Sequence, residues 1–376
     1  MSLRILIASD KFKGSLASPV VCEIIEKGLL FVHPGLQITR LPLADGGDGL
    51  LDMILHYRHA RTRLAEVSDP LSRPVSARWL LAEDGKTAYI EMAAASGLDL
   101  LDPAEYDCMR ASTYGTGQLI REAIGMGVEE VIIGIGGSAT NDGGIGMAAA
   151  LGYRFLDGLG RELAPCGESL SRIERIDTTK KMSWEGIRFR VACDVKNPLC
   201  GPQGATRIYA PQKGASPAMV EMLEAGMQHY AKALENYAGR DVAGQAGAGA
   251  AGGLGAGCMA FLQAALVSGT DLAIEYSRAD HYAREADIII TGEGRLDHQT
   301  LQGKLVSGIA SLGRKYNKPV LVICGSLGLS PEDLREAGIT AAFSIVNKPM
   351  LLEEAMGDAS RLLYFISCNI GSILLI

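Results

Sequence analysis

Charged side chains gather in five short, glycine-containing loops, each of which follows a run of aliphatic residues. The loops lie at positions 9–15, 45–49, 136–144, 194–201 and 291–297. The ionisable residues that they contribute are Asp10, Lys11, Lys13, Asp45, Asp48, Asp142, Asp194, Glu293, Arg295 and Asp297. A surplus of carboxylates with a few cations suits a Mg²⁺–nucleotide complex together with a small anionic substrate.

The loop at 136–144 has the composition of an anion-binding turn. It follows three β-branched residues at 131–133, which predict a buried strand, and apolar residues with helical spacing resume after it. Glycine lets a backbone approach a ligand, and the first N–H groups of a helix attract anions. The predicted binding residues are Gly136, Gly137, Ser138, Thr140, Asn141 and Asp142. The alternative is a tight strand–helix turn that needs glycine only for its geometry.

Two other loops carry candidate metal or substrate ligands. Asp45 and Asp48 lie three residues apart after the predicted strand 37–44 and could hold Mg²⁺ directly or through water. An Asx turn with Asp48 as a helix cap is the alternative. Asp194 and Asn197 follow the predicted strand 187–193, where a β-turn before Pro198 is an equally good interpretation.

Other nucleotide and catalytic motifs fail. Gly247, Gly249 and Gly252 match GxGxxG, but no strand pattern precedes them, so a flexible loop or a close-packing helix start fits better than a dinucleotide site. The Gly303–Lys304 pair lacks the remaining residues of a P-loop. Among the six histidines only His298 adjoins one of the five loops, which disfavours histidine-based hydrolysis or hydride transfer.

Composition and charge indicate which kinds of molecule the protein binds and in which cellular compartment it works. The chain has 376 residues and a net charge of −7 without a basic patch, so nucleic-acid binding is not expected. Its eight cysteines are scattered and form no CxxC pair, which favours reduced thiols. No signal peptide and no apolar run of about 20 residues is apparent, so we expect a soluble, cytoplasmic protein that does not bind membranes.

The pattern of elements predicts an α/β protein with two domains. Strands and helices alternate near both ends of the chain, which is typical of a Rossmann- or flavodoxin-like parallel sheet. Between about 62 and 93 the pattern changes to alternating strands with turn residues, which is typical of antiparallel pairing. We therefore predict a discontinuous domain of 1–75 plus 285–376 and an inserted mixed α/β domain of 76–284.

The five loops together resemble the motifs of the glycerate kinases called type 1. The matching segments are ASDKFKGSL at 8–16, LADGGDG at 43–49, GIGGSATNDGG at 134–144, CDVKNPL at 193–199 and TGEGRLD at 291–297. They occur in the order of the family and span nearly the whole chain. The resemblance implies ATP-dependent phosphorylation of D-glycerate with Mg²⁺, by an enzyme whose active site lies in the cleft between its two domains.

Roles within such a site are our own inference. Asp45 and Asp48, or Asp194, hold Mg²⁺, while Lys11 and Lys13 bind phosphate or carboxylate oxygens and Arg295 clamps an anion bidentately. Asp194 or Asp297 accepts the substrate proton. Further contacts are expected from Asp10, Asn197 and Glu293. The sequence leaves open the product, 2- or 3-phosphoglycerate, the loop that binds adenine, and the oligomeric state, for which a homo-oligomer is allowed. Alternatives are a kinase for another small hydroxy acid and a non-catalytic phosphosugar-binding protein.

Overall fold

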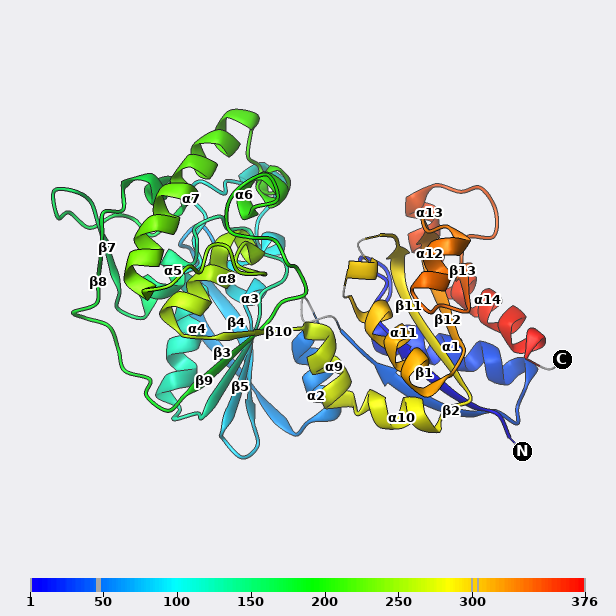
Figure 1. The fold of residues 1–376 in the computed structure, drawn as a ribbon. Coiled ribbons are helices and arrows are strands. Elements are labelled where there is room, and N and C mark those ends of the chain that lie inside the picture. Colours follow the sequence, from blue (N-terminus) through cyan, green and yellow to red (C-terminus); the bar gives the residue numbers. More distant parts are fainter. Residues whose placement is uncertain (1, 45–48, 299, 303, 375–376) are drawn as a thin grey trace. The chain divides into compact units, whose positions relative to one another are not determined.

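The chain folds into two compact units in the computed structural model, which describes residues 2–44, 49–298, 300–302 and 304–374 (Figure 1). The first unit consists of residues 1–45 and 268–376, and the second of residues 46–267. The second unit is therefore an insertion into the first, as predicted.

The first unit is built on a five-stranded sheet in which every pair of neighbours is parallel. Its order is β13-β12-β11-β1-β2, so that counted within the unit the strands run 2-1-3-4-5, the flavodoxin-like order. The strands are β1 (Arg4–Ser9), β2 (Gln37–Pro42), β11 (Ile288–Leu296), β12 (Val320–Leu327) and β13 (Ala341–Ser344).

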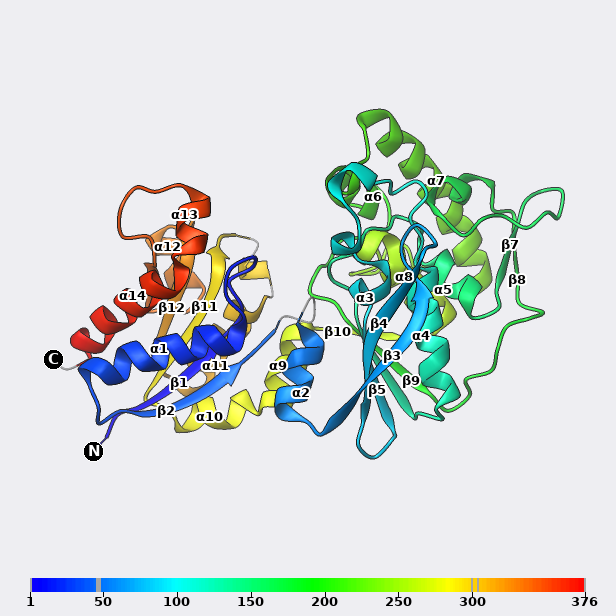
Figure 2. The ribbon, with the colours of Figure 1, turned by 180° about the vertical axis from the view of Figure 1, so that it is seen from behind.

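Helices cover both faces of this sheet, because its strands are apolar on both sides. One face packs Ile5 and Ile7 against α1 and α14, which lie in front of the sheet in Figure 2. The other packs Val322 against Val306 and Ala310 of α11. The helices of this unit are α1 (Ser18–Val32), α9 (Gly269–Ser277), α10 (Ala279–Glu285), α11 (Leu305–Tyr316), α12 (Pro331–Glu336), α13 (Leu352–Gly357) and α14 (Ala359–Ile373), with the 3-10 turn η5 (Thr300–Gln302).

The second unit contains a six-stranded mixed sheet of order β10-β9-β6-β5-β4-β3. The pairs β10–β9, β9–β6 and β6–β5 are parallel. The pairs β3–β4 and β4–β5 are antiparallel, as the alternating pattern predicted. The strands are β3 (Ala60–Ser68), β4 (Pro74–Ala82), β5 (Thr87–Glu91), β6 (Glu130–Gly134), β9 (Arg188–Ala192) and β10 (Ala265–Val267). A separate pair is formed by β7 (Arg154–Leu156) and β8 (Arg175–Asp177).

One large apolar core joins this sheet to its helices, and it includes Trp79, Ile133, Met147 and Phe261. The helices are α2 (Leu50–Tyr57), α3 (Ala93–Ser96), α4 (Tyr114–Gly125), α5 (Ile145–Ala150), α6 (Ala205–Tyr209), α7 (Pro217–Ala238) and α8 (Ala250–Phe261). Short 3-10 turns are η1 (Leu98–Leu100), η2 (Pro103–Glu105), η3 (Gly167–Arg172) and η4 (Pro211–Lys213). None of the helices within the described ranges has both the length and the apolar character needed to span a membrane.

The boundaries of the two units differ from the predicted positions, 75 and 285. Residues 49–75 belong to the second unit because β3 pairs along its length with β4, from Ala60↔Ala82 to Ser68↔Pro74. Helices α9 and α10 belong to the first unit, where α10 packs against α11 and β1. Sequence periodicity indicated the strands β3 and β4 but not the sheet to which they belong, and it gave no prediction for α9 and α10.

Candidate functional site

The turn after β6 is organised by the carboxylate of Asp142, which is fully buried. Its Oδ2 accepts hydrogen bonds from the backbone N–H of Thr113 at 2.7 Å, the Thr113 hydroxyl at 2.8 Å and the N–H of Gly146 at 3.2 Å. Its Oδ1 accepts from the N–H of Gly144 at 3.0 Å. Burial raises the pKa of the Asp142 carboxyl, and these four donors oppose that shift. Asp142 therefore holds the turn together from the inside.

The protein itself occupies the backbone N–H groups at the start of helix α5. Gly144 and Gly146 donate to the side chain of Asp142, Ile145 donates to its backbone oxygen, and Met147 donates to the hydroxyl of Thr113 at 2.8 Å. An internal carboxylate at a helix N-terminus satisfies the groups that a phosphate would otherwise bind. Both carboxylate oxygens of Asp142, for which a binding role was predicted, are thus engaged by the turn itself.

The other half of the turn lies against Lys213, the last residue of η4. Its ammonium Nζ donates to the hydroxyl of Ser138 at 2.6 Å and to the carbonyl of Thr140 at 2.7 Å. Lys213 is only 2% exposed, and burial lowers its pKa to about 8. The neighbouring Asn141 donates through Nδ2 to the hydroxyl of Thr206 at 3.1 Å. A cation is thus placed on the turn that the sequence marked as an anion site.

The glycine-rich run that matched GxGxxG packs directly on this turn. Ala251, Gly252 and Gly253 have φ of 53°, 66° and 91°, a left-handed turn inside α8. The carbonyl of Gly252 accepts from Gly143 N–H at 2.9 Å, and a Cβ at Gly252 would lie 2.0 Å from the carbonyl of Thr140. The interpretation of a close-packing helix start is confirmed, since only glycine leaves room for this approach.

The loop after β9 places Asp194 at the carboxyl end of the same sheet, partly exposed. Its neighbour Asn197 is held at both ends of its amide. Nδ2 donates to the carbonyl of Gln203 at 2.7 Å, and Oδ1 accepts from the hydroxyl of Tyr209 at 2.7 Å. The geometry gives Asn197 a structural task, while Asp194 keeps the position of a candidate base or metal ligand.

In the first unit the candidate residues lie where the strand order reverses, between β1 and β11. The N–H of Asp10 and the hydroxyl of Ser9 both donate to the carbonyl of Gly292, at 3.0 and 3.1 Å. A Cβ at Gly294 would lie 3.3 Å from the N atom of Lys13, so the loop after β1 runs closely over β11. Ligands of open parallel sheets bind at such a reversal point. The structure therefore brings Asp10, Lys11 and Lys13 beside the segment that carries Glu293.

Most of the segment predicted as a loop, residues 291–296, belongs to strand β11. Strand β11 continues to Leu296 because Arg295 and Leu296 pair with Ser326 and Leu327 of an equally long β12. Arg295 remains 79% exposed, and its Nε lies 2.9 Å from Oδ2 of Asp297. Two glycines in the motif suggested a turn, but an adjacent strand with free backbone groups favoured extension instead.

Asp45 and Asp48, the predicted magnesium ligands, lie outside the described residues. Within the ranges that the structure does describe, no group of three or more histidine, cysteine, aspartate and glutamate side chains is arranged to hold a metal ion.

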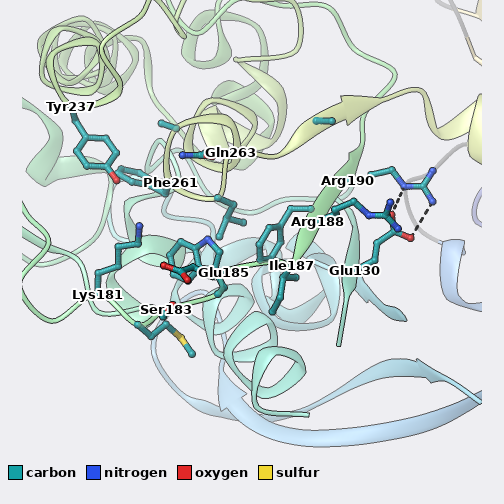
Figure 3. Close-up of a pocket in the computed structure, with 17 residues that line it drawn as sticks. Glu130, Lys181, Ser183, Glu185, Ile187, Arg188, Arg190, Tyr237, Phe261 and Gln263 are labelled. Atoms are coloured by element: carbon teal, nitrogen blue, oxygen red, sulfur yellow. Dashed lines mark hydrogen bonds and ion pairs between the residues drawn. The ribbon is translucent and has the colours of Figure 1, made fainter. Parts of the chain in front are cut away.

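A large open cavity lies at the opposite end of β6 from the turn. It has a volume of about 1000 Å³, and Figure 3 shows Glu130 with Arg188 and Arg190 on one side and Lys181 on the other. Glu130 begins β6 and Arg188 begins β9, so the cavity marks the amino ends of these parallel strands. The ammonium of Lys181 lies 4.6 Å from the ring centre of Trp184. None of the predicted site residues lines this cavity, and parallel sheets bind ligands at their carboxyl ends, so the cavity gives no reason to move the candidate site away from the loops after the strands.

Comparison with known proteins decides the family. Residues 5–375 match the family model of the glycerate kinase family. The chain belongs to the glycerate kinase family. A glycerate kinase from Halalkalibacterium halodurans is 43% identical over 98% of this chain and 97% of its own length. A glycerate 2-kinase from Escherichia coli is 42% identical over 100% and 98%.

A solved structure agrees with this membership. A crystal structure described as glycerate kinase 2 of Salmonella typhimurium LT2 is 40% identical, with a TM-score of 0.84 and coverage of 100% of this chain and 98% of the other. The predicted α/β class and the predicted enzyme class, a kinase, are confirmed. The chain is thus a glycerate kinase family member that carries an inserted mixed-sheet unit.

Sequence reasoning missed Thr113 and Lys213. Both act on the turn after β6 from distant positions, Thr113 through Asp142 and Lys213 through Ser138 and Thr140. Neither stands in a glycine-rich loop after a strand, which was the signal used to find candidates. The one hint in the sequence was the glycine that follows Lys213. In the structure this Gly214 has φ of 90° and lies close to the carbonyl of Tyr106, so the backbone there is constrained.

Proposed function

We propose that this protein transfers the γ-phosphoryl group of ATP to a hydroxyl of D-glycerate with Mg²⁺, as a glycerate kinase of type 1. The observation that carries the proposal is full-length similarity at about 40% identity to proteins named for that reaction, including one named glycerate 2-kinase. That last name favours 2-phosphoglycerate as the product. The predicted location of the active site, in a cleft between the domains, stays a prediction.

The oxygen donors of the chain fit a magnesium–nucleotide complex. Mg²⁺ in kinases uses one or two carboxylates and completes its shell with phosphates and water, so a large protein cluster is not required. Asp194 follows β9 by two residues and Asp10 directly follows β1, each partly exposed at the carboxyl edge of its own sheet. Asp45 and Asp48 remain the other proposed ligands. When bound, Mg²⁺ would neutralise charge on the β- and γ-phosphate oxygens.

The remaining roles follow the exposure of each side chain. Lys11 and Lys13 are proposed to bind phosphate or carboxylate oxygens above the β1–β11 reversal point, with Asp10 and Glu293 positioning the loop. Arg295 is largely exposed and presents its guanidinium for a bidentate contact. Asp297 faces Arg295 and the N–H of Thr300. Asp194 and Asp297 are both proposed as acceptors of the substrate proton.

The test is release of ADP by the purified protein with ATP, Mg²⁺ and D-glycerate, with the product passed to enolase. Rapid release supports the proposal, and direct use of the product by enolase assigns 2-phosphoglycerate. No ADP above a glycerate-free control would contradict it. A panel of small hydroxy acids would then test another acid kinase, and binding of ATP without turnover would indicate a non-catalytic protein.

Residue roles are tested by Asp→Asn changes at 45, 48, 194 and 297. We expect the Asp→Asn change at the general base, Asp194 or Asp297, to lower kcat by about 10²-fold or more. Near-wild-type turnover in all four variants would overturn the carboxylate scheme.

A further inference from the structure

Lys213 is a buried cation whose charge the described part of the chain does not neutralise by an ion pair. No aspartate or glutamate described in the structure lies within 4.0 Å of its Nζ, and its two hydrogen-bond acceptors, Ser138 and Thr140, are neutral. Asp142 is the nearest carboxylate with an electrostatic influence on it, but its oxygens are engaged by the four donors of the turn. Burying an ammonium without a counter-ion costs free energy, and a bound anion would offset that cost.

Two further polar atoms of the same turn have no partner among the described residues. They are the hydroxyl Oγ1 of Thr140 and the amide oxygen Oδ1 of Asn141, and both residues are fully buried. Buried hydroxyl and amide groups are nearly always hydrogen-bonded, so atoms left over in a rigid turn point to a missing ligand. An ammonium has three protons, and Lys213 uses two of them on the turn.

The chemistry of the three groups is complementary to a hydroxy acid. The ammonium and the Thr140 hydroxyl can donate to an oxyanion, while the Asn141 oxygen can accept from a hydroxyl. Carboxylates and phosphates both offer the oxyanion, and a hydroxy acid offers a carboxylate for the donors together with a hydroxyl for the acceptor. The turn reaches solvent at Gly137, which is exposed, and at Ser138, which contacts the ammonium directly.

We infer that Lys213 and Thr140 bind the carboxylate of the hydroxy-acid substrate, with Asn141 accepting a hydrogen bond from one of its hydroxyls. The inference rests on the proposed function, since it assigns one part of that substrate to one turn. It keeps Thr140 and Asn141 from the binding residues predicted on this turn, and it adds Lys213, which the sequence did not single out.

A structural cross-link is the competing explanation, in which Lys213 merely ties η4 to the turn. The two explanations separate at Thr140, because its hydroxyl has no protein partner to lose. Thr140→Val keeps the shape of the side chain and the carbonyl that Lys213 contacts. If the hydroxyl serves a ligand, the variant weakens binding without lowering the melting temperature. If it serves nothing, the variant is neutral in binding as well.

The experiment measures melting temperature, D-glycerate binding by calorimetry, and KM for D-glycerate and ATP in the full-length protein. The variants are Thr140→Val and Lys213→Met, with exposed matched controls Thr62→Val and Lys232→Met from the same unit. We expect KM for D-glycerate to rise about 10-fold in Thr140→Val and about 10- to 100-fold in Lys213→Met, the loss typical of a hydrogen bond to a charged group. KM for ATP should stay within about twofold.

The outcomes separate the inference from the proposed function. A rise in KM for ATP alone would assign the turn to nucleotide phosphate and overturn the carboxylate assignment. Unchanged KM for both substrates in Thr140→Val and in folded Lys213→Met would overturn the oxyanion site altogether. If the wild type fails to phosphorylate D-glycerate, the proposed function fails, and binding of inorganic phosphate then tests the site. In that case loss of phosphate binding in Lys213→Met still supports an oxyanion site, and retention contradicts it.

Discussion

The carboxyl edges of the two sheets hold their charged groups in different ways. In the second unit Asp142 and Lys213 are buried, and each is fixed by hydrogen bonds to the turn after β6. In the first unit Lys13 and Arg295 project into solvent, and Arg295 has one ion pair. Buried groups are costly to remove and keep one geometry, whereas exposed groups are cheap to remove and adapt to a ligand. The difference predicts which substitutions damage folding and which damage only activity.

The largest effect is expected from Asp142→Asn. An amide can replace at most one acceptor oxygen and brings two N–H groups toward the donors of Thr113, Gly144 and Gly146. We expect a loss of about 3–5 kcal/mol in the free energy of unfolding, as for a broken buried network. Urea unfolding measures it, with the exposed Asp99→Asn as control. A loss equal to that of the control would contradict the assignment of Asp142 as the organiser of the turn.

Gly252→Ala should follow closely. Its backbone has φ of 66°, and the new Cβ would lie 2.0 Å from the carbonyl of Thr140. We expect a loss of about 3 kcal/mol or more, because overlap with backbone adds to the left-handed strain. Gly85→Ala is the matched control, since it has φ of 73° but open space around the Cβ. It should cost only about 1–2 kcal/mol. Equal losses would show that close packing is not what requires glycine at 252.

The pH dependence of substrate affinity sharpens the contrast further. Because burial lowers the pKa of Lys213 to about 8, the ammonium loses its proton as the pH rises through that value. KM for D-glycerate should then rise by about tenfold per pH unit above 8, and this rise should be absent in Lys213→Met. The nearby Cys108 thiol stays neutral in this range, since burial raises its pKa to about 11.

The lowered pKa of Lys213 has opposite consequences for binding and for stability as the pH rises. The pKa of Lys213 is lower in the folded protein than its ordinary value of 10.5, so the unfolded chain binds more protons between the two values. The contribution of Lys213 to the free energy of unfolding therefore increases as the pH rises from about 8 toward 10.5. Without substrate, the difference in urea midpoint between wild type and Lys213→Met should therefore change as the pH rises across this range. Parallel curves would show that the lysine is not desolvated.

The smallest effect on folding is expected from Arg295→Ala. An ion pair with a side chain that is 79% exposed contributes little, and we expect less than about 0.5 kcal/mol. Turnover should nevertheless fall if the guanidinium contacts the substrate or phosphate. Melting temperature and kcat/KM measured on one preparation decide between the two effects. A large loss of stability would place Arg295 with the buried groups and erase the contrast between the two edges.

Much of the fold was visible in the sequence, because its signals are local. The βα units at both ends, the antiparallel β3–β4 pair and the strand–turn–helix around 131–150 all appear in the spacing of apolar residues. The loop that became the second half of β11 was misread because pairing with β12 is a distant interaction. The predicted domain boundaries differ from the observed ones for the same reason, because the sequence does not show which sheet β3 joins.

The chemistry of the turn was only partly predictable. Residues 138–142 stood out by composition, but the sequence does not show that Asp142 points inward to Thr113 or that Lys213 arrives from a segment more than 70 residues away. Side-chain direction and long-range approach depend on packing. A lysine in a helix-rich stretch looks like an ordinary surface residue until its burial is known.

The central pairing of the first unit affects the order in which the chain can fold during synthesis. Strand β1 is synthesised well before β11, yet Ile5 pairs with Ile288 of β11 on one side, and only β2 is nearby in sequence on the other. Residues 46–267 are complete before β11 is made. We expect the inserted unit to form while the apolar β1 and β2 wait for a partner, since domains fold as units during synthesis and long-range pairing is slow. Strand β1 therefore waits for the synthesis of the whole inserted unit before its second neighbour appears, although it ends up between β2 and β11 in the interior of the sheet.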